Sequence, residues 1–304
     1  MEKIEEELLE TIAGDDVRTG AYNIRKNGKG VERQITENVK IETKKDGTGI
    51  DIYVKENTKF EIVHIPVIIT QSGLKDVVYN DFYIGKNANV VIFAGCGIHN
   101  DEHNDSQHDG IHRFFLEEGA KVRYYEKHYG EGDGRGKQIM NPTTIVHLAQ
   151  GASLEMETTQ IAGIDDTIRK TSGDLAAQAS LVIKEKILTV GDQHAVTDFN
   201  VELNGEGCSA NVISRSVARD HSVQEFKSNI NGNTACAGHS ECDAIIMDDA
   251  KVIATPGLVA NNIDATLIHE AAIGKIAGEQ LIKLMTLGLT EQEAEEQIVN
   301  GFLE

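Results

Sequence analysis

The sequence repeats a short turn-and-strand segment at Asn87-Ala88-Asn89-Val90, Gly119-Ala120-Lys121-Val122 and Gly151-Ala152-Ser153-Leu154, and the three copies are evenly spaced along the chain. Looser copies begin at Gly207 and Asp249. A small turn pair followed by an apolar strand, at a near-constant period, is what the stacked rungs of a solenoid require. A β-sandwich also contains many short strands, but it does not predict a regular period. We therefore expect a mainly β fold of the solenoid type.

The strands predicted after these turns alternate between apolar and polar side chains. Leu154 and Met156 would face one side of a strand, while Glu155 and Glu157 would face the other. The same alternation recurs at residues 199–204. Such a pattern is typical of strands that bury one face and expose the other.

The pattern divides the chain into three segments. Residues 1–75 are a mixed α/β segment with a helical opening, and residues 76–270 form the expected β-solenoid core. Residues 271–304 place apolar side chains at helical spacing, and Thr290-Glu-Gln-Glu293 is a capping box that would begin a last helix. These helices could protect the open end of the solenoid or form a docking surface.

Composition excludes several classes of function. The formal net charge is -20 and no cluster of Lys and Arg dominates, so we expect no nucleic-acid partner. Apolar runs such as Val90–Ala94 are far shorter than the roughly 20 residues that span a bilayer, so we expect no membrane role. The N-terminus lacks the basic and apolar regions of a signal peptide, which predicts a cytoplasmic protein.

The glycine-rich stretch from Gly130 to Lys137 is not a phosphate-binding loop. No Ser or Thr follows Lys137, the spacing differs from that of a P-loop, and the acidic residues in the stretch would repel phosphate. We therefore expect that the chain does not hydrolyse ATP by itself.

One cluster of potential metal ligands lies between Cys96 and His112. It contains, in close succession, the thiol of Cys96 and the imidazoles of His99, His103, His108 and His112. Imidazole and thiolate suit iron or zinc, but these spacings match no standard closed zinc site. The histidines could bind a metal ion, or they could simply make hydrogen bonds.

A second cluster contains Cys236 and Cys242, and His269-Glu270 follows about one rung further along the chain. If rungs stack here, residues about one rung apart come close in space, so Cys242 and His269 could be neighbours. A thiolate beside an imidazole and a carboxylate can hold sulfur or iron. The alternative is a buried cysteine and a histidine satisfied by backbone groups.

The C-terminal third resembles a known family. The resemblance rests on an ordered series of motifs: Gly238-His-Ser-Glu-Cys-Asp-Ala-Ile-Ile246, Pro256, His269-Glu-Ala-Ala-Ile-Gly-Lys-Ile276, Glu279-Gln-Leu281, Gly288-Leu289 and Gly301-Phe302. Together these motifs are similar to the SufB/SufD family of iron–sulfur cluster assembly proteins, over about a third of the chain.

The resemblance implies a right-handed parallel β-helix with C-terminal helices that dock a SufC-like ATPase of the ABC class. It implies that Cys242 receives sulfur and helps to hold a transient iron–sulfur cluster, with His269 and Glu270 as further ligands of iron and Cys236 in reserve. It also implies a homodimer or a SufB/SufD-type heterodimer, and sulfur supplied by a cysteine desulfurase system. Flavin binding stays open.

The leading hypothesis is therefore a scaffold for cluster assembly that is not itself an enzyme. A rival hypothesis is a metalloenzyme on a β-solenoid, with zinc or iron held by the histidines between Cys96 and His112. A purely structural solenoid is a third.

Overall fold

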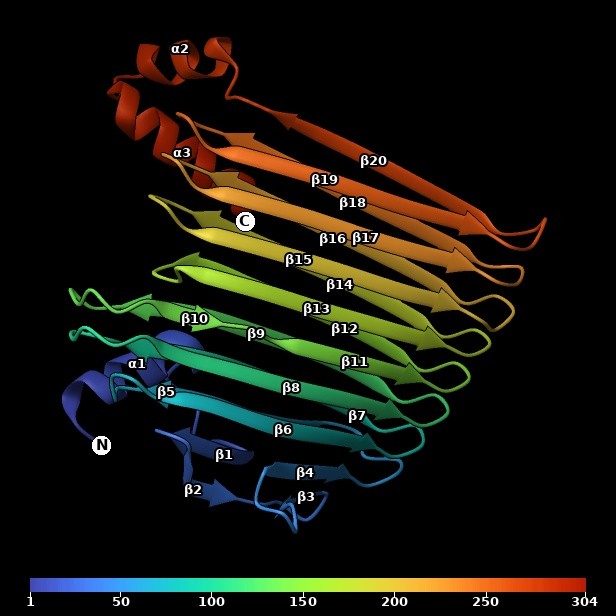
Figure 1. Cartoon of the computed structure of the whole chain (residues 1–304). Helices are drawn as coiled ribbons and strands as arrows, with labels where there is room; N and C mark the ends of the chain where they lie inside the picture. Colours follow the sequence, from blue (N-terminus) through green and yellow to red (C-terminus); the bar gives the residue numbers. More distant parts are fainter.

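In the computed structural model the chain folds into a parallel β-helix whose two sheets face each other, with one helix near the N-terminus of the chain and two at its C-terminus (Figure 1). The structure describes residues 1–304 apart from the side chain of Ala162. One sheet contains β1 (Ala21–Lys26), β2 (Lys29–Gln34), β5 (Glu61–Ile69), β7 (Asn89–His99), β9 (Lys121–Glu131), β12 (Ser153–Ala162), β14 (Ser180–Thr189), β16 (Ser209–Ala218), β18 (Ala237–Ile246) and β20 (Thr266–Gly274). We call it sheet A.

The facing sheet, sheet B, contains β3 (Val39–Thr43), β4 (Gly49–Val54), β6 (Lys75–Ile84), β8 (Ser106–Leu116), β10 (Gln138–Met140), β11 (Thr143–Leu148), β13 (Asp166–Leu175), β15 (His194–Leu203), β17 (Val223–Gly232) and β19 (Lys251–Ala260). The helices are α1 (Lys3–Ala13), α2 (Gly278–Thr286) and α3 (Glu291–Leu303). The predicted β-solenoid is confirmed. The division of the chain at residues 75 and 270 stays a prediction.

The sequence repeat corresponds to the rungs of sheet A. Asn89, Lys121 and Ser153 pair in register across β7, β9 and β12, at the constant spacing that the repeat predicts. Beyond β12 the rungs become a few residues shorter: Ser153 pairs with Ser180 of β14, and the later pairings up to β20 keep this closer spacing. The copy at Gly207 precedes β16 of this sheet, whereas the copy at Asp249 precedes β19 of sheet B.

The first residue of each repeated segment explains why the segments look alike. Asn87, Gly119, Gly151 and Gly207 have φ values of 55°, 68°, 65° and 71°. This left-handed backbone conformation is open to glycine and tolerated by asparagine, but it is costly for most other residues. The corners before these four strands therefore favour Gly or Asn, whereas before β14 the same conformation is adopted by Gln178, with a φ of 58°.

The space between the sheets holds a continuous apolar core. Val90, Val122 and Leu154 point into it from successive rungs, and Phe82 stacks on Phe114 with ring centroids 4.4 Å apart. Removing these side chains from water is the main favourable term that holds the rungs together.

At the N-terminal end of the β-helix the two sheets finish in antiparallel strand pairs, β1–β2 and β3–β4. Helix α1 lies against the outer face of sheet A, over β5 and β7. Its Leu8 side chain lies close to Gly97, where an added Cβ would approach Leu8 to 3.2 Å. Glycine at this outward position of β7 therefore lets the helix approach the sheet.

The C-terminal helices continue from the last rung (Figure 1). Val299 and Leu303 of α3 are buried against Val217 of β16. The predicted capping box is present: the Thr290 hydroxyl accepts a hydrogen bond from the Glu293 amide at 3.2 Å, and the Glu293 carboxylate accepts one from the Thr290 amide at 2.8 Å. In the described structure, no helix is long and apolar enough to cross a membrane.

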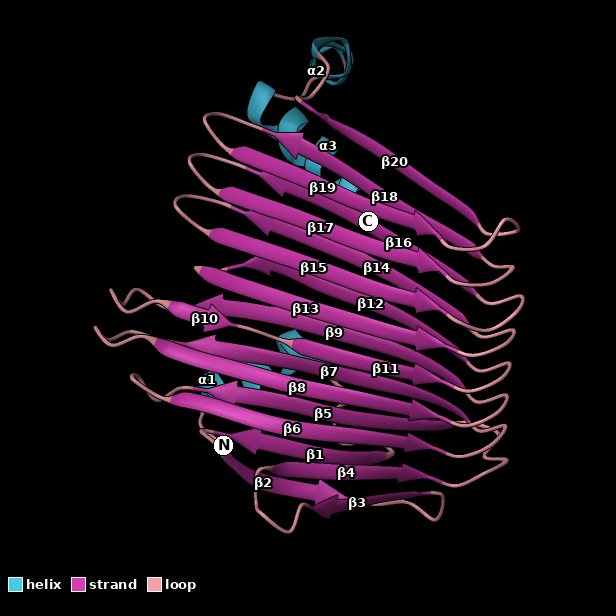
Figure 2. Cartoon of the chain, turned by 45° about the vertical axis from the view of Figure 1, so that its right-hand side comes forward, coloured by secondary structure: helices cyan, strands magenta, loops and turns pink.

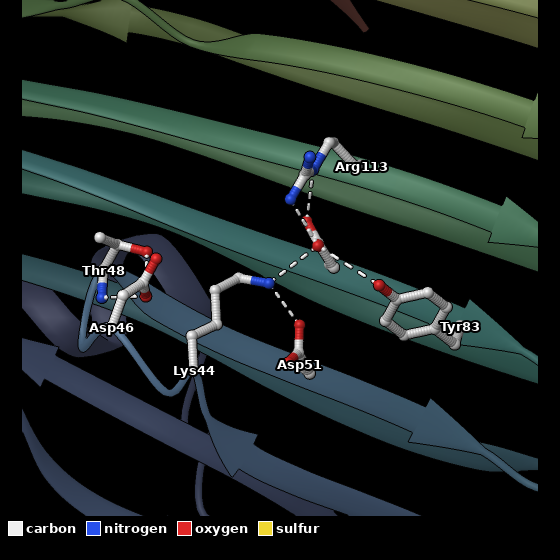
Figure 3. Close-up of polar contacts among 7 residues, drawn as sticks. Lys44, Asp46, Thr48, Asp51, Tyr83 and Arg113 are labelled. Carbon is white, nitrogen blue, oxygen red and sulfur yellow. Dashed lines mark hydrogen bonds and ion pairs between the residues drawn. The ribbon is translucent and has the colours of Figure 1, made fainter.

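An ion-pair network on the outer side of sheet B joins β4, β6 and β8 (Figure 3). The buried carboxylate of Asp81 on β6 accepts two hydrogen bonds of 2.6 Å from Arg113 on β8. It also accepts one of 2.8 Å from Lys44, whose ammonium group contacts Asp51 on β4 as well. Four charged side chains thus connect three neighbouring strands.

Candidate functional site

The last two strands of sheet A place Cys242 and His269 on the same face. Strands β18 and β20 are parallel neighbours in which Ser240 pairs with His269 and Cys242 pairs with Ala271. Ser240 and Cys242 are buried, so both side chains face the interior between the sheets. His269, which pairs with Ser240, faces the same way. His269 is therefore the diagonal neighbour of Cys242, two positions along the adjacent strand.

The surroundings of these two side chains differ. Cys242 is 1% exposed, whereas His269 is half-buried on the last rung, at the open end of the β-helix. The buried Nδ1 atom of His269 has no hydrogen-bond partner among the described residues. A buried polar atom usually has one, so this nitrogen is available to a ligand that the chain does not itself supply.

Burial also controls the protonation of the thiol. It raises the pKa of Cys242 to about 12, and the negative charges of Glu185 and Asp243 act in the same direction. At neutral pH the group is a thiol. A bound cation would favour the thiolate instead, because opposite charge stabilises the ionised form.

Glu270 lies on the other face of the sheet from His269. Successive residues of a strand point to opposite sides, and the Glu270 carboxylate reaches the outer surface, where one of its oxygens is 3.5 Å from His239 Nε2. Within one chain, Cys242 and His269 are thus brought together, and Glu270 is separated from them by the sheet.

Cys236 occupies a third environment. It lies at the corner before β18 and is buried in the apolar core, near Cys208 of the preceding rung. Six residues of extended chain, about 20 Å, separate it from Cys242. The structure does not bring these two thiols together.

The residues of the first cluster are divided between the interior and a surface loop. Cys96, His108 and His112 line a small interior cavity, whereas His99 ends β7 and His103 lies in the following loop. This loop and the one after β9 lie side by side, joined by backbone hydrogen bonds from Gly134 to Asn100 and from Gly136 to Glu102 (Figure 2).

The interior histidines have partners within the chain. His112 contacts the Tyr124 hydroxyl at 2.6 Å and the Asn80 amide at 3.3 Å, and His108 Nδ1 is 3.2 Å from Asp76. In this structure His108 and His112 therefore make hydrogen bonds within the chain, which is the second of the two alternatives that the sequence left open for these histidines. The structure does not collect the four histidines into one site.

A buried charge network near this cavity was missed from the sequence. Arg169 of β13 donates hydrogen bonds to Glu126 at 2.5 Å and to His128 at 3.2 Å, and its Nε atom is 3.5 Å from Glu185. These side chains are all within the β-helix. The signal was present: Glu126 and His128 continue the inward parity that Val122 and Tyr124 establish on β9.

The network continues toward Cys242. Glu185 accepts hydrogen bonds from Thr197 at 3.0 Å and from Ser214 at 2.8 Å. Ser214 of β16 is the register partner of Cys242 on β18. A line of buried polar side chains therefore runs along the inner face of sheet A and ends beside the thiol.

Residues 69–302 match the family model described as the SufBD core domain of the SUF system for iron–sulfur cluster assembly. This match covers more than half of the chain. It includes the strands on which Cys242 and His269 lie.

Among curated proteins, an iron–sulfur cluster assembly SufBD family protein of Pyrococcus horikoshii is 30% identical over 99% of this chain and 63% of its own length. One from Methanothermobacter thermautotrophicus (strain Winter) is 28% identical over 78% of this chain, and one from Methanocaldococcus jannaschii is 28% identical over 79% of it. The aligned regions cover 57% of the Methanothermobacter protein and 76% of the Methanocaldococcus protein.

Proposed function

The chain belongs to the SufBD family of iron–sulfur cluster assembly proteins, and from this premise we propose that it is a scaffold on which a nascent cluster is built. In this proposal iron and sulfur are the cargo, and the chain supplies the groups that hold them. The observation that carries it is the pair formed by Cys242 and His269 on the inner face of β18 and β20. Thiolate and imidazole are both ligands that iron accepts.

Cys242 is the proposed sulfur acceptor. A donor persulfide, supplied by a cysteine desulfurase system, would transfer its terminal sulfur when the Cys242 sulfur attacks it. A new S–S bond forms on Cys242, the S–S bond of the donor breaks, and the donor leaves as a thiol that takes up the proton released by Cys242. His269, with its unpartnered Nδ1, would then bind iron beside the added sulfur.

Glu270 has a different place in this proposal. Because it lies on the outer face, it would reach a cluster only where a second chain meets the edge of β20. A homodimer or a SufB/SufD-type heterodimer formed through this end would provide such a place.

A partner ATPase of the ABC class, resembling SufC, would use the C-terminal helices. The side chains of α2 are exposed or half-buried, and Ile282 of α2 and Leu287 just after it are 63% and 77% exposed. Met285, about one helical turn from Ile282, is 42% exposed, and exposed apolar side chains that gather on one surface mark an interaction site.

The proposal is tested by anaerobic reconstitution with iron, sulfide and the desulfurase, comparing Cys242→Ala with Cys208→Ala. Both residues are 1% exposed, so the two variants remove similar buried groups. We expect Cys242→Ala to abolish the acid-labile sulfide and visible absorption of the cluster, and Cys208→Ala to retain them. A full cluster on a folded Cys242→Ala chain would remove this residue from the mechanism.

A further inference from the structure

Three side chains with metal-binding atoms converge on the outer face of β18 and β20. They are His239 and Glu241 of β18 and Glu270 of β20, and one ligand atom from each lies within 4.8 Å of the other two. We propose that this cluster, called the outer site, binds one divalent transition-metal ion. The outer site shares Glu270 with the proposed scaffold function but rests on separate observations, because it lies on the opposite face of the sheet from Cys242 and His269.

The ring of His239 is oriented as a metal ligand would be. Its Nδ1 atom is 2.9 Å from Oδ1 of Asn211, the register partner of His239 on β16. An amide oxygen only accepts hydrogen bonds, so in the neutral imidazole Nδ1 donates the proton and Nε2 has the lone pair. Nε2 is the atom that points to Glu270, at 3.5 Å. Metal-binding histidines are commonly fixed by a second hydrogen bond of this kind.

The two carboxylates lie opposite each other. Glu241 and Glu270 are register partners, and like charges in such positions repel. Elsewhere on the outer face of sheet A, carboxylates face lysines: Glu155 pairs with Lys184 at 2.7 Å and Glu157 with Lys186 at 3.0 Å. Across the described residues, none of the ion pairs made by Lys or Arg includes Glu241 or Glu270. A divalent cation would neutralise the two charges that the chain leaves facing each other.

The donor set restricts the class of ion. One imidazole nitrogen and two carboxylate oxygens suit Zn²⁺, Fe²⁺ or Mn²⁺, whereas Mg²⁺ and Ca²⁺ prefer oxygen ligands throughout. The Glu270 side chain is 67% exposed and that of His239 is 29% exposed. An ion can therefore enter from solvent, and water can complete its coordination.

Zinc binding tests the outer site. The experiment is isothermal titration of Zn²⁺ into the full chain carrying Cys242→Ser, so that the proposed sulfur site does not contribute a thiol. We expect one equivalent of Zn²⁺ to bind, and this equivalent to be lost in His239→Ala and in Glu270→Gln. Asn211→Ala should weaken binding about 10-fold, since it removes only the partner that orients the ring.

The matched control is His194→Ala. His194 lies on an outer strand face with its Nε2 atom 3.8 Å from Glu225, but that carboxylate is already paired with Lys227 at 3.0 Å. This variant should keep the full equivalent. Absence of binding in the parent chain, or equal losses in His194→Ala and His239→Ala, would overturn the outer site. Glu270→Gln removes a repelling charge at an exposed position, so unfolding of the variant would not explain a loss.

Discussion

At the scale of single residues, the interior of the β-helix contains charges whose stability depends on one another. Arg169 and Glu126 are each 3% exposed at the side chain, and Glu185 is 1% exposed. A buried ion pair is not strong evidence of stability by itself, because both ions lose hydration. Removing one partner is more severe, because the other charge stays buried without compensation.

Arg169→Ala should therefore lower the free energy of unfolding by about 3–5 kcal/mol. The measurement is urea denaturation at neutral pH. Lys184→Ala is the control, because its partner Glu155 is 45% exposed and an exposed pair contributes about 1 kcal/mol at most. Equal effects of the two substitutions would show that the interior charges are hydrated and that Glu126 does not depend on Arg169.

At the scale of elements, the network around Asp81 connects β4, β6 and β8 (Figure 3). Burial alone would raise the pKa of Asp81, but hydrogen bonds and positive charge from Arg113 and Lys44 outweigh it and lower the pKa. Asp51 and Tyr83 are the other titratable groups that face this cluster. The pKa of Asp81 in the folded chain is thus below that of an unfolded aspartate, about 3.9.

A lowered pKa in the folded state contributes stability above the unfolded pKa and loses it as the pH falls toward the folded pKa. Asp81→Asn should lower the free energy of unfolding by about 1–3 kcal/mol at pH 7, because Arg113 and Lys44 lose a charged acceptor. The difference from the parent chain should shrink below about pH 4. Urea denaturation at a series of pH values measures it, with the exposed Glu42→Gln as control. A difference that stays constant down to pH 2 would contradict the assigned pKa shift.

Helix α2 has no buried residue, so a partner protein is expected to cover it. Ile282→Glu should prevent capture of a SufC-like ATPase while leaving the melting temperature within about 2 °C, since its side chain is 63% exposed. Pull-down with the purified ATPase measures the first effect and circular dichroism the second. Ile168→Glu, an exposed position on β13, is the control and should retain the ATPase. Undiminished capture by Ile282→Glu would place the docking surface elsewhere.

The sequence predicts the rungs better than it predicts the site. A near-constant period is enough to identify stacked turns, because the corners at Asn87, Gly119, Gly151 and Gly207 share a positive φ that Gly and Asn tolerate best. The same period predicts that Cys242 and His269 lie on neighbouring strands. Their relation to Glu270 depends on whether the residues around 270 are extended, since only a strand sends consecutive side chains to opposite faces.

The buried charges are difficult to predict from the sequence for a related reason. Glu126, Arg169 and Glu185 would be assigned to an outer face by polarity, although the strand parity places them inside. Partners on other strands stabilise these groups inside: Arg169 contacts both glutamates, and Glu185 also accepts hydrogen bonds from β15 and β16. The register of these strands is set by corners whose spacing shortens beyond β12. That register cannot be read from any one strand.

At the scale of the whole molecule, the two ends of the β-helix are built differently. At the N-terminal end the sheets finish in the antiparallel pairs β1–β2 and β3–β4, whereas at the C-terminal end they finish in the parallel strands β19 and β20. An unpaired sheet edge is a template for pairing with another chain unless it is blocked. The last rung also exposes apolar side chains, namely Leu258, Val259, Ile263, Ile268 and Ile273.

This asymmetry leads to a prediction about assembly: the chain forms a dimer through its C-terminal rung. Leu258→Glu combined with Ile263→Glu places two negative charges at that end, and the net charge of -20 makes the repulsion between two chains stronger. Sedimentation velocity should show a dimer for the parent chain and a monomer for the double variant. Ile168→Glu adds the same charge to an exposed apolar position on β13, in the middle of sheet B, and should leave the dimer intact. A parent chain that sediments as a monomer at micromolar concentration would mean that this end is closed by a different partner, and Glu270 would then lack the second chain through which it could reach a cluster.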